Sequence, residues 1–136
     1  MNWFTPDMND GLNVFVFGSN RQGRHGKGAA EIAKTFWGAI YGRGEGRQGM
    51  AYAIPTKDKP DGMLRLEEIQ EHVETFLEYA RRHQRFKFLI TEIGCGLAGY
   101  SPKYIAPLFV NAPPNCVFTD TFKAVLIRCE QEDKGQ

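Results

Sequence analysis

Short apolar runs alternate with longer amphipathic stretches along the chain. Residues 13–18 are largely apolar on both faces, which is typical of a strand buried on both sides of a sheet. The helical spacing that follows, within residues 28–37, is formed by Ala29, Ile32, Ala33 and Phe36. Because small side chains let a helix approach a sheet closely, the pattern predicts a first unit of one strand and one helix.

The longest helical pattern covers residues 66–83. Its apolar side chains form one stripe, made by Leu66, Ile69, Val73, Phe76, Leu77 and Ala80. Acidic residues gather at its start and basic residues at its end, which matches the direction of the helix dipole. We interpret this helix as structural.

Further elements are predicted on either side of it. Residues 50–54 indicate a strand that ends at Pro55, and residues 86–93 indicate a buried strand. Ser101 followed by Pro102 is a favourable helix start. That helix should end near residue 111, before two consecutive prolines.

The C-terminal part gives weaker signals. Residues 116–118 suggest an edge strand, and residues 122–129 fit a helix or a strand equally well by periodicity. Residues 130–136 are polar, and we expect them to be disordered.

Residues 38–49 contain five glycines together with Arg43, Glu45 and Arg47. Such a composition resists regular structure and is typical of a mobile surface loop. This segment could close over a ligand.

The alternation of strands and helices predicts an α/β fold with right-handed crossovers and a ligand crevice at the carboxyl ends of its strands. The chain has 136 residues, 42% of them hydrophobic, which suits one domain over residues 1–136 and excludes a second. We expect the core of that domain to cover about residues 13–129.

Charge and cysteine content narrow the classes of function. The 17 basic and 16 acidic residues leave a formal charge of +1, too little for a strong field that attracts nucleic acid. A single-strand binding module using Arg21, Arg24, Arg43 and Arg47 therefore ranks last.

Three cysteines without a CxxC pair, and a start without a leader pattern, predict a cytoplasmic protein. No apolar run is long enough to span a membrane, so we expect no membrane partner.

Two glycine-bearing segments carry the most specific chemistry. We call residues 18–28 the first glycine loop and residues 94–100 the second; each lies between a strand-like run and a helix-like run. Backbone N–H groups at such a junction face the positive end of the helix dipole, and glycines let an anion approach them. The pair predicts a ligand with a diphosphate or two separated anions. The expected ligand-binding residues are Gly18, Ser19, Asn20, Gly26, Gly28, Gly94, Cys95, Gly96, Leu97, Ala98, Gly99 and Tyr100. For the glycines, tight turns and helix packing are the alternative.

Three motifs resemble macro domains, which bind ADP-ribose. The strings FGSN and HGKGAA within residues 17–30 resemble the first ligand loop of that superfamily. AIPTK at residues 53–57 resembles one of its strand ends, and IGCGL at residues 93–97 its second phosphate loop. The resemblance extends from about Val14 to about Phe109 and is closest to the branch of Lys-dependent ADP-ribosyl-glutamate hydrolases. The strings also look like a small bacterial and phage group of macro-like proteins. The resemblance to macro domains implies a three-layer α/β/α sandwich.

The resemblance also implies roles for three candidate catalytic residues. Asn20 matches the amide that contacts the distal ribose, the alternative being an asparagine that only forms a turn. Lys57 matches the lysine that attacks the anomeric carbon, and a surface or phosphate-pairing lysine is an equal alternative. His25 could bond a ribose or phosphate oxygen or carry a proton, and a turn histidine is its alternative.

The sequence departs from that family at two positions. The acidic residue that recognises adenine has no clear match in residues 1–13. The Asp that accompanies the lysine in the Lys-dependent branch is Ala98 here. Adenine specificity and the covalent lysine mechanism are therefore not carried over.

The remaining nucleophile and metal candidates are less favourable. Cys95 sits at a predicted helix N-terminus, so a thiol nucleophile is conceivable, but no Asn/Asp–His signature accompanies it and we favour a packed small residue. His72 and His83 lie off the apolar stripe and away from other ligand types, so we expect them to be solvated. We expect no metal and no cofactor.

These observations lead to one expected function and one alternative. The protein should bind ADP-ribose or a derivative and hydrolyse an ADP-ribosyl linkage, with a positioned water attacking the anomeric carbon. Nucleic acid would then be a partner only as an ADP-ribosylated substrate. The alternative is a non-catalytic ADP-ribose reader, because the sequence offers no unambiguous general base.

Overall fold

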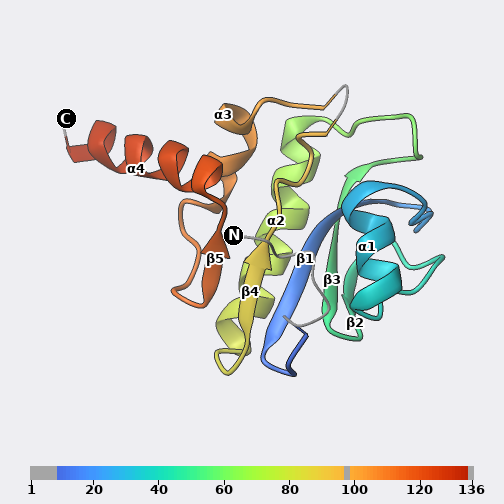
Figure 1. Ribbon diagram of the computed structural model, residues 1–136. Coiled ribbons are helices and arrows are strands. Elements are labelled where there is room, and N and C mark those ends of the chain that lie inside the picture. The colour runs from blue at the N-terminus through green and yellow to red at the C-terminus, as the bar shows by residue number, and fades with distance from the viewer. Residues whose placement is uncertain (1–8, 97–98, 135–136) are drawn as a thin grey trace.

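The computed structural model describes residues 9–96 and 99–134 of the chain. Within them the fold is mixed α/β, with one five-stranded sheet in the order β2-β3-β1-β4-β5 (Figure 1). The strands are β1 (Asn13–Asn20), β2 (Gly46–Gln48), β3 (Ala51–Lys57), β4 (Lys87–Ile90) and β5 (Cys116–Phe118). The helices are α1 (Gly28–Phe36), α2 (Leu66–Arg82), α3 (Pro102–Ile105) and α4 (Asp120–Lys134), with a 3-10 turn η2 (Ala106–Phe109) after α3.

The strand directions bring the two glycine loops to one edge of the sheet. β1 lies between β3 and β4 and runs parallel to both, while β2 runs antiparallel to β3. The carboxyl ends of β1, β3 and β4 therefore meet at the same edge, where ligand crevices form in parallel sheets. The first glycine loop begins in the last residues of β1, and the second follows four residues after β4 ends.

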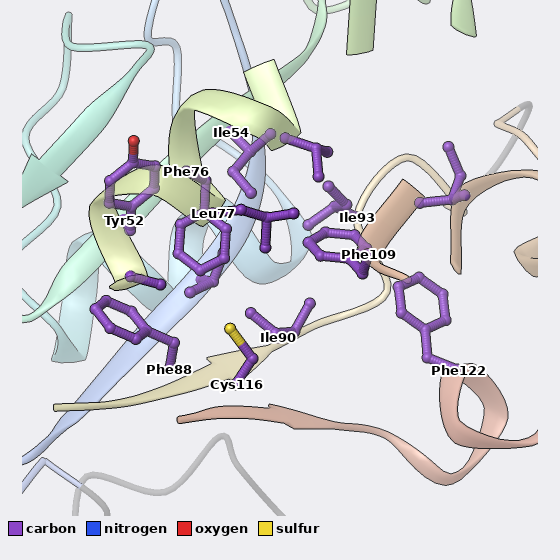
Figure 2. Packing of buried hydrophobic residues seen from close by; sticks show 14 of the residues in the cluster. Tyr52, Ile54, Phe76, Leu77, Phe88, Ile90, Ile93, Phe109, Cys116 and Phe122 are labelled. Carbon is purple, nitrogen blue, oxygen red and sulfur yellow. The ribbon is translucent and has the colours of Figure 1, made fainter. Parts of the chain in front are cut away.

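Alternate side chains of β1 enter two separate apolar clusters. Val14 and Val16 belong to the cluster that includes the buried stripe of α2, part of which is shown in Figure 2. Phe15 and Phe17 belong to the cluster on the other face, which includes Ala33 of α1. Because successive side chains of a strand point to opposite faces, α1 and α2 cover opposite faces of the sheet.

Several predicted boundaries differ from the observed ones, and the strand expected over residues 86–93 is shorter, because β4 covers only Lys87–Ile90. β3 does not end at Pro55 but continues to Lys57. β2 pairs only with residues 51–53 of β3, so Pro55 lies where β3 has lost that neighbour, and a proline is tolerated at an edge. The predicted helix from Pro102 breaks into α3 and η2 and ends at Phe109, near the expected place.

The C-terminal part is helical. The ambiguous residues 122–129 belong to α4, which packs Phe122 into the core with no exposed surface. The expected disorder from Glu130 onward is wrong as far as Lys134, because α4 continues to that residue. Residues 135–136 lie outside the described part. The edge strand at residues 116–118 is confirmed as β5. None of the helices in the described ranges has the length and apolar character needed to cross a membrane.

Candidate functional site

Two adjoining hollows of about 350 and 470 Å³ lie at the carboxyl edge of β1 and β3. We call them together the crevice. Both are bordered by Gly18, Lys27, Ala30, Thr56 and Lys57. The first hollow extends along the first glycine loop, and the second extends to Gly94, Gly96 and Gly99 of the second loop. The structure thus brings the two loops to one continuous depression.

Some of the expected phosphate-binding glycines are packing residues. A Cβ on Gly18 would lie 3.3 Å from the Gly94 nitrogen and 3.3 Å from Thr56 Oγ1, so Gly18 lets the two loops contact each other. A Cβ on Gly99 would overlap the Gly94 carbonyl oxygen. For Gly18 and Gly99 the close approach of backbone explains the glycine without any ligand.

Three other glycines leave open space at the crevice. A Cβ built on Gly26, Gly28 or Gly96 would meet no atom within 4 Å. Gly28 has a φ of +57°, which favours glycine in any case, whereas no positive φ is recorded for Gly26 or Gly96. At these two positions no contact with the described residues and no positive φ requires glycine, which leaves room for an anion near the backbone amides.

The other expected binding residues fall into three groups. Ser19 is buried and its hydroxyl donates to the carbonyl of Gly44, yet it borders the first hollow. Tyr100 donates its hydroxyl to the Leu64 carbonyl at 2.9 Å and does not border the crevice in the described structure. Leu97 and Ala98 lie outside the described residues.

Asn20 closes the first glycine loop. Its side-chain oxygen accepts from the Arg24 N–H at 3.1 Å, and its amide nitrogen donates to the Arg24 carbonyl at 3.1 Å. The turn-forming role that the sequence left open is therefore present. Asn20 also borders the first hollow, and its two bonds to Arg24 use one hydrogen and one lone pair of an amide that can offer two of each.

Lys57 lies at the end of β3 and borders both hollows. Its ammonium donates to the Pro60 carbonyl at 3.3 Å. The neighbouring Asp58 pairs instead with Arg21, at 3.6 Å. The lysine is therefore placed for contact with a ligand in either half of the crevice.

His25 is the expected catalytic residue that the structure removes from the site. The ring is fully buried, lies edge-on to Phe17 and has its Nε2 2.9 Å from the Arg43 carbonyl. Because a carbonyl only accepts, Nε2 must be the protonated nitrogen. His25 has no exposed atom and is not among the described residues that line the crevice. It holds residues 38–49 against the first loop, and its role as a proton carrier stays a prediction.

Cys95 has the environment of a protected thiol. Burial, and secondarily the carboxylate of Glu92, raises the pKa of Cys95 from 9.0 to about 11. The thiol is therefore protonated at neutral pH, whereas a nucleophilic cysteine needs a lowered pKa. This supports the packed small residue favoured from the sequence.

The segment of residues 38–49 is more ordered than its composition suggests. It contains β2, and the carbonyls of Arg43 and Gly44 accept from His25 and Ser19 of the first loop. On its other side Glu45 contacts His72 Nδ1 of α2 at 2.6 Å. The prediction of an irregular segment is wrong at β2, and the prediction of a solvated His72 is wrong as well.

Sequence reasoning missed five charged or aromatic residues on the crevice wall. They are Arg24, Lys27, Tyr41 and Asp61 in the first hollow and Glu92 in the second, with Lys27 in both. Lys27 stands at the N-cap position of α1, between two glycines, so its place in the loop string was a usable signal. Glu92 follows β4 by two residues, where side chains of a parallel sheet reach the carboxyl edge. No motif in the neighbouring sequence indicated that Tyr41 or Asp61 would border the crevice.

Comparison with known proteins adds no relative to these observations. No protein-family model matches the chain, and the searches of curated proteins and of solved structures find no match. Among the described residues no group of three or more His, Cys, Asp or Glu side chains could hold a metal ion.

Proposed function

We propose that this protein binds ADP-ribose or a close derivative in the crevice. The observation that carries the proposal is the meeting of both glycine loops at one depression on the carboxyl edge of the parallel strands β1, β3 and β4. The motif resemblance supplies the identity of the ligand and, with it, the proposal that the fold is a macro-domain-like three-layer α/β/α sandwich.

The charges around the crevice favour an anionic ligand at its centre. Lys27 and Lys57 border both hollows, and Arg24 borders the first. Lys27 also stands at the start of α1, where backbone N–H groups and the helix dipole add positive potential. A diphosphate between the two loops would face these cations and the open space beside Gly26 and Gly96.

The proposed activity is hydrolysis of an ADP-ribosyl linkage. A water oxygen forms a bond to the anomeric carbon while the bond from that carbon to the modified group breaks, and the leaving group keeps the electron pair. The water proton passes to a phosphate oxygen of the ligand or to a carboxylate on the crevice wall, Asp61 or Glu92. Asn20 would hold the ribose, and attack by Lys57 is the covalent variant.

A reader function is favoured by a different observation. Asn20 bonds the Arg24 backbone, Lys57 bonds the Pro60 carbonyl and His25 is buried, so all three expected catalytic residues have structural partners. A crevice whose expected catalytic residues are held by such contacts is suited to binding ADP-ribose without catalysing a reaction. The two functions therefore differ in whether a phosphate oxygen of the ligand, Asp61 or Glu92 takes the proton of an attacking water.

Incubation with ADP-ribose linked to Glu, Asp or Ser peptides and to nucleic acid separates the two functions. Release of free ADP-ribose by the wild type, reduced in Glu92→Gln or Asp61→Asn, supports hydrolysis with a carboxylate base. Glu67→Gln is the matched control, because Glu67 is exposed on α2 and does not border the crevice. Binding without release from any linkage supports the reader, and no binding at all overturns the proposal.

A further inference from the structure

α4 carries an apolar groove far from the crevice. In Figure 1 the helix projects beyond the β5 edge of the sheet. Its inner side is anchored by Phe122, whose ring lies 6.2 Å from that of Phe109. Beside this anchored side a groove of about 510 Å³ runs between α4 and the residues after η2. Ile127 on one bank and Val110 on the other are each 52% exposed.

The α4 bank of the groove has an ordered charge pattern, with Leu126 half-buried against the core and Lys123, Ile127 and Glu130 exposed. Lys123, Leu126, Ile127 and Glu130 all border it. Their spacing of three, four and seven residues places them on one face of the helix. The middle of that face is apolar, its N-terminal end carries a cation and its C-terminal end an anion.

We propose that this face pairs with the same face of a second copy of the chain, with the two α4 helices antiparallel about a two-fold axis. The midpoint between Lys123 and Glu130 falls between Leu126 and Ile127. A two-fold axis through that midpoint therefore places Lys123 of each copy opposite Glu130 of the other. The two apolar pairs meet at the centre, with Val110 beside them.

The charge order selects a second copy over other occupants. A helix that lies antiparallel on this face needs apolar residues at its centre, an anionic side chain facing Lys123 and a cationic side chain facing Glu130. α4 itself presents that face when turned by the two-fold axis, as an isologous contact requires. One helix pair and its flanking groove form a small interface, so the dimer is weak and depends on concentration. This inference is independent of the proposed ligand.

Charge reversal tests the pairing. Sedimentation velocity of the wild-type chain from micromolar to millimolar concentration should show a monomer that converts to a dimer. Lys123→Glu and Glu130→Lys, each alone, should raise the dimer dissociation constant by roughly tenfold, because like charges then face each other at both ends of the contact. Arg128→Glu makes the same charge change on the opposite face of α4 and should leave the dimer unchanged.

Mixing the two single variants gives the sharper result. In a mixed dimer the two carboxylates of one copy face the two ammonium groups of the other, so Lys123→Glu and Glu130→Lys should associate with each other more strongly than either does with itself. The double variant should dimerise like the wild type. All substituted positions are exposed, and circular dichroism checks that each variant is folded. A wild type that stays monomeric at every concentration overturns the proposal, as does a mixture that associates no better than its components.

Discussion

The amide of Asn20 and the backbone of Arg24 hold each other by two hydrogen bonds, both 3.1 Å long. The pair closes the turn that leads from β1 into the first glycine loop. Any ligand contact by Asn20 is therefore made by a side chain that the loop has already fixed in place. Such preorganisation lowers the entropy cost of binding.

Replacing Asn20 should affect the loop and the ligand together. Asn20→Ala removes two part-buried hydrogen bonds to Arg24, and because a bond of this kind contributes about 0.5–1.5 kcal/mol, we expect the free energy of unfolding to fall by about 1–3 kcal/mol. ADP-ribose binding should weaken and release from a linked substrate should fall severely. Chemical denaturation followed by calorimetry measures both effects.

Asn20→Asp is the matched variant, because it keeps the acceptor for the Arg24 N–H and loses the donor. Its loss of stability should be smaller than that of Asn20→Ala. An alanine variant with wild-type stability would show that the two bonds do not hold the loop.

We expect Lys57 to assist the hydrolysis rather than to act as its nucleophile. In the Lys-dependent hydrolases that the motifs resemble, a carboxylate accompanies the lysine, and Ala98 stands at that position here, so we expect Lys57→Ala to lower ADP-ribose release only modestly. Lys59→Ala is the matched control, since Lys59 is exposed and does not border the crevice. A covalent adduct trapped on Lys57 by borohydride would replace the water mechanism with lysine attack.

Residues 38–49 should be protected from exchange before any ligand is added. The Gly42 N–H donates to the Gly23 carbonyl at 2.8 Å, and the Ile40 N–H donates to Gln48 Oε1 at 2.7 Å. Hydrogen exchange of these two amides should therefore be slow in the free protein, and ADP-ribose should slow mainly the amides near Tyr41 on the crevice wall. Fast exchange of the whole segment that ligand then slows would establish the mobile lid instead.

This segment shows where sequence reasoning stops. The apolar patterns of β1, α1 and α2 were sufficient to place those elements, because their side chains repeat with the period of the structure. The order within residues 38–49 comes from contacts with distant side chains, notably the buried His25 and Ser19, and glycine content hides such contacts. Local sequence likewise cannot show that β2 leaves Pro55 at an edge.

The residues that line the crevice were predictable to a similar extent, while their role in binding stays a prediction. Both loops and Asn20 were found because glycines and amides at strand ends form recognisable strings. Tyr41 and Asp61 reach the crevice through the path of their loops, which no short string encodes. His25 was misplaced because a histidine in a polar loop gives no sign of burial.

Cys95 should react slowly with alkylating agents at neutral pH. Its pKa of about 11 in the folded protein exceeds the ordinary 9.0, so the thiol stays protonated, and its alkylation should accelerate only as the pH approaches 11. By linkage, the thiol favours folding below pH 9, and this contribution is lost as the pH rises through 11. Mass spectrometry after iodoacetamide treatment measures the rate at Cys95. Rapid labelling at pH 7 that abolishes ADP-ribose release would restore the thiol nucleophile.

The open space beside two glycines allows the most direct test of the binding site. Among the described residues Gly26, Gly62 and Gly96 share open space at the Cβ position without a recorded positive φ, and only Gly62 does not border the crevice. A valine should therefore be accommodated at all three positions without large strain, while at Gly26 and Gly96 it would fill the space proposed for the diphosphate.

Calorimetric titration of ADP-ribose into the wild type and the three valine variants is that test. The account predicts binding by the wild type and by Gly62→Val, and affinity at least about tenfold weaker in folded Gly26→Val and Gly96→Val, a loss of about 1.4 kcal/mol. A wild type that does not bind ADP-ribose, or folded Gly26→Val and Gly96→Val variants that bind it as well as Gly62→Val does, would contradict the assignment of the crevice.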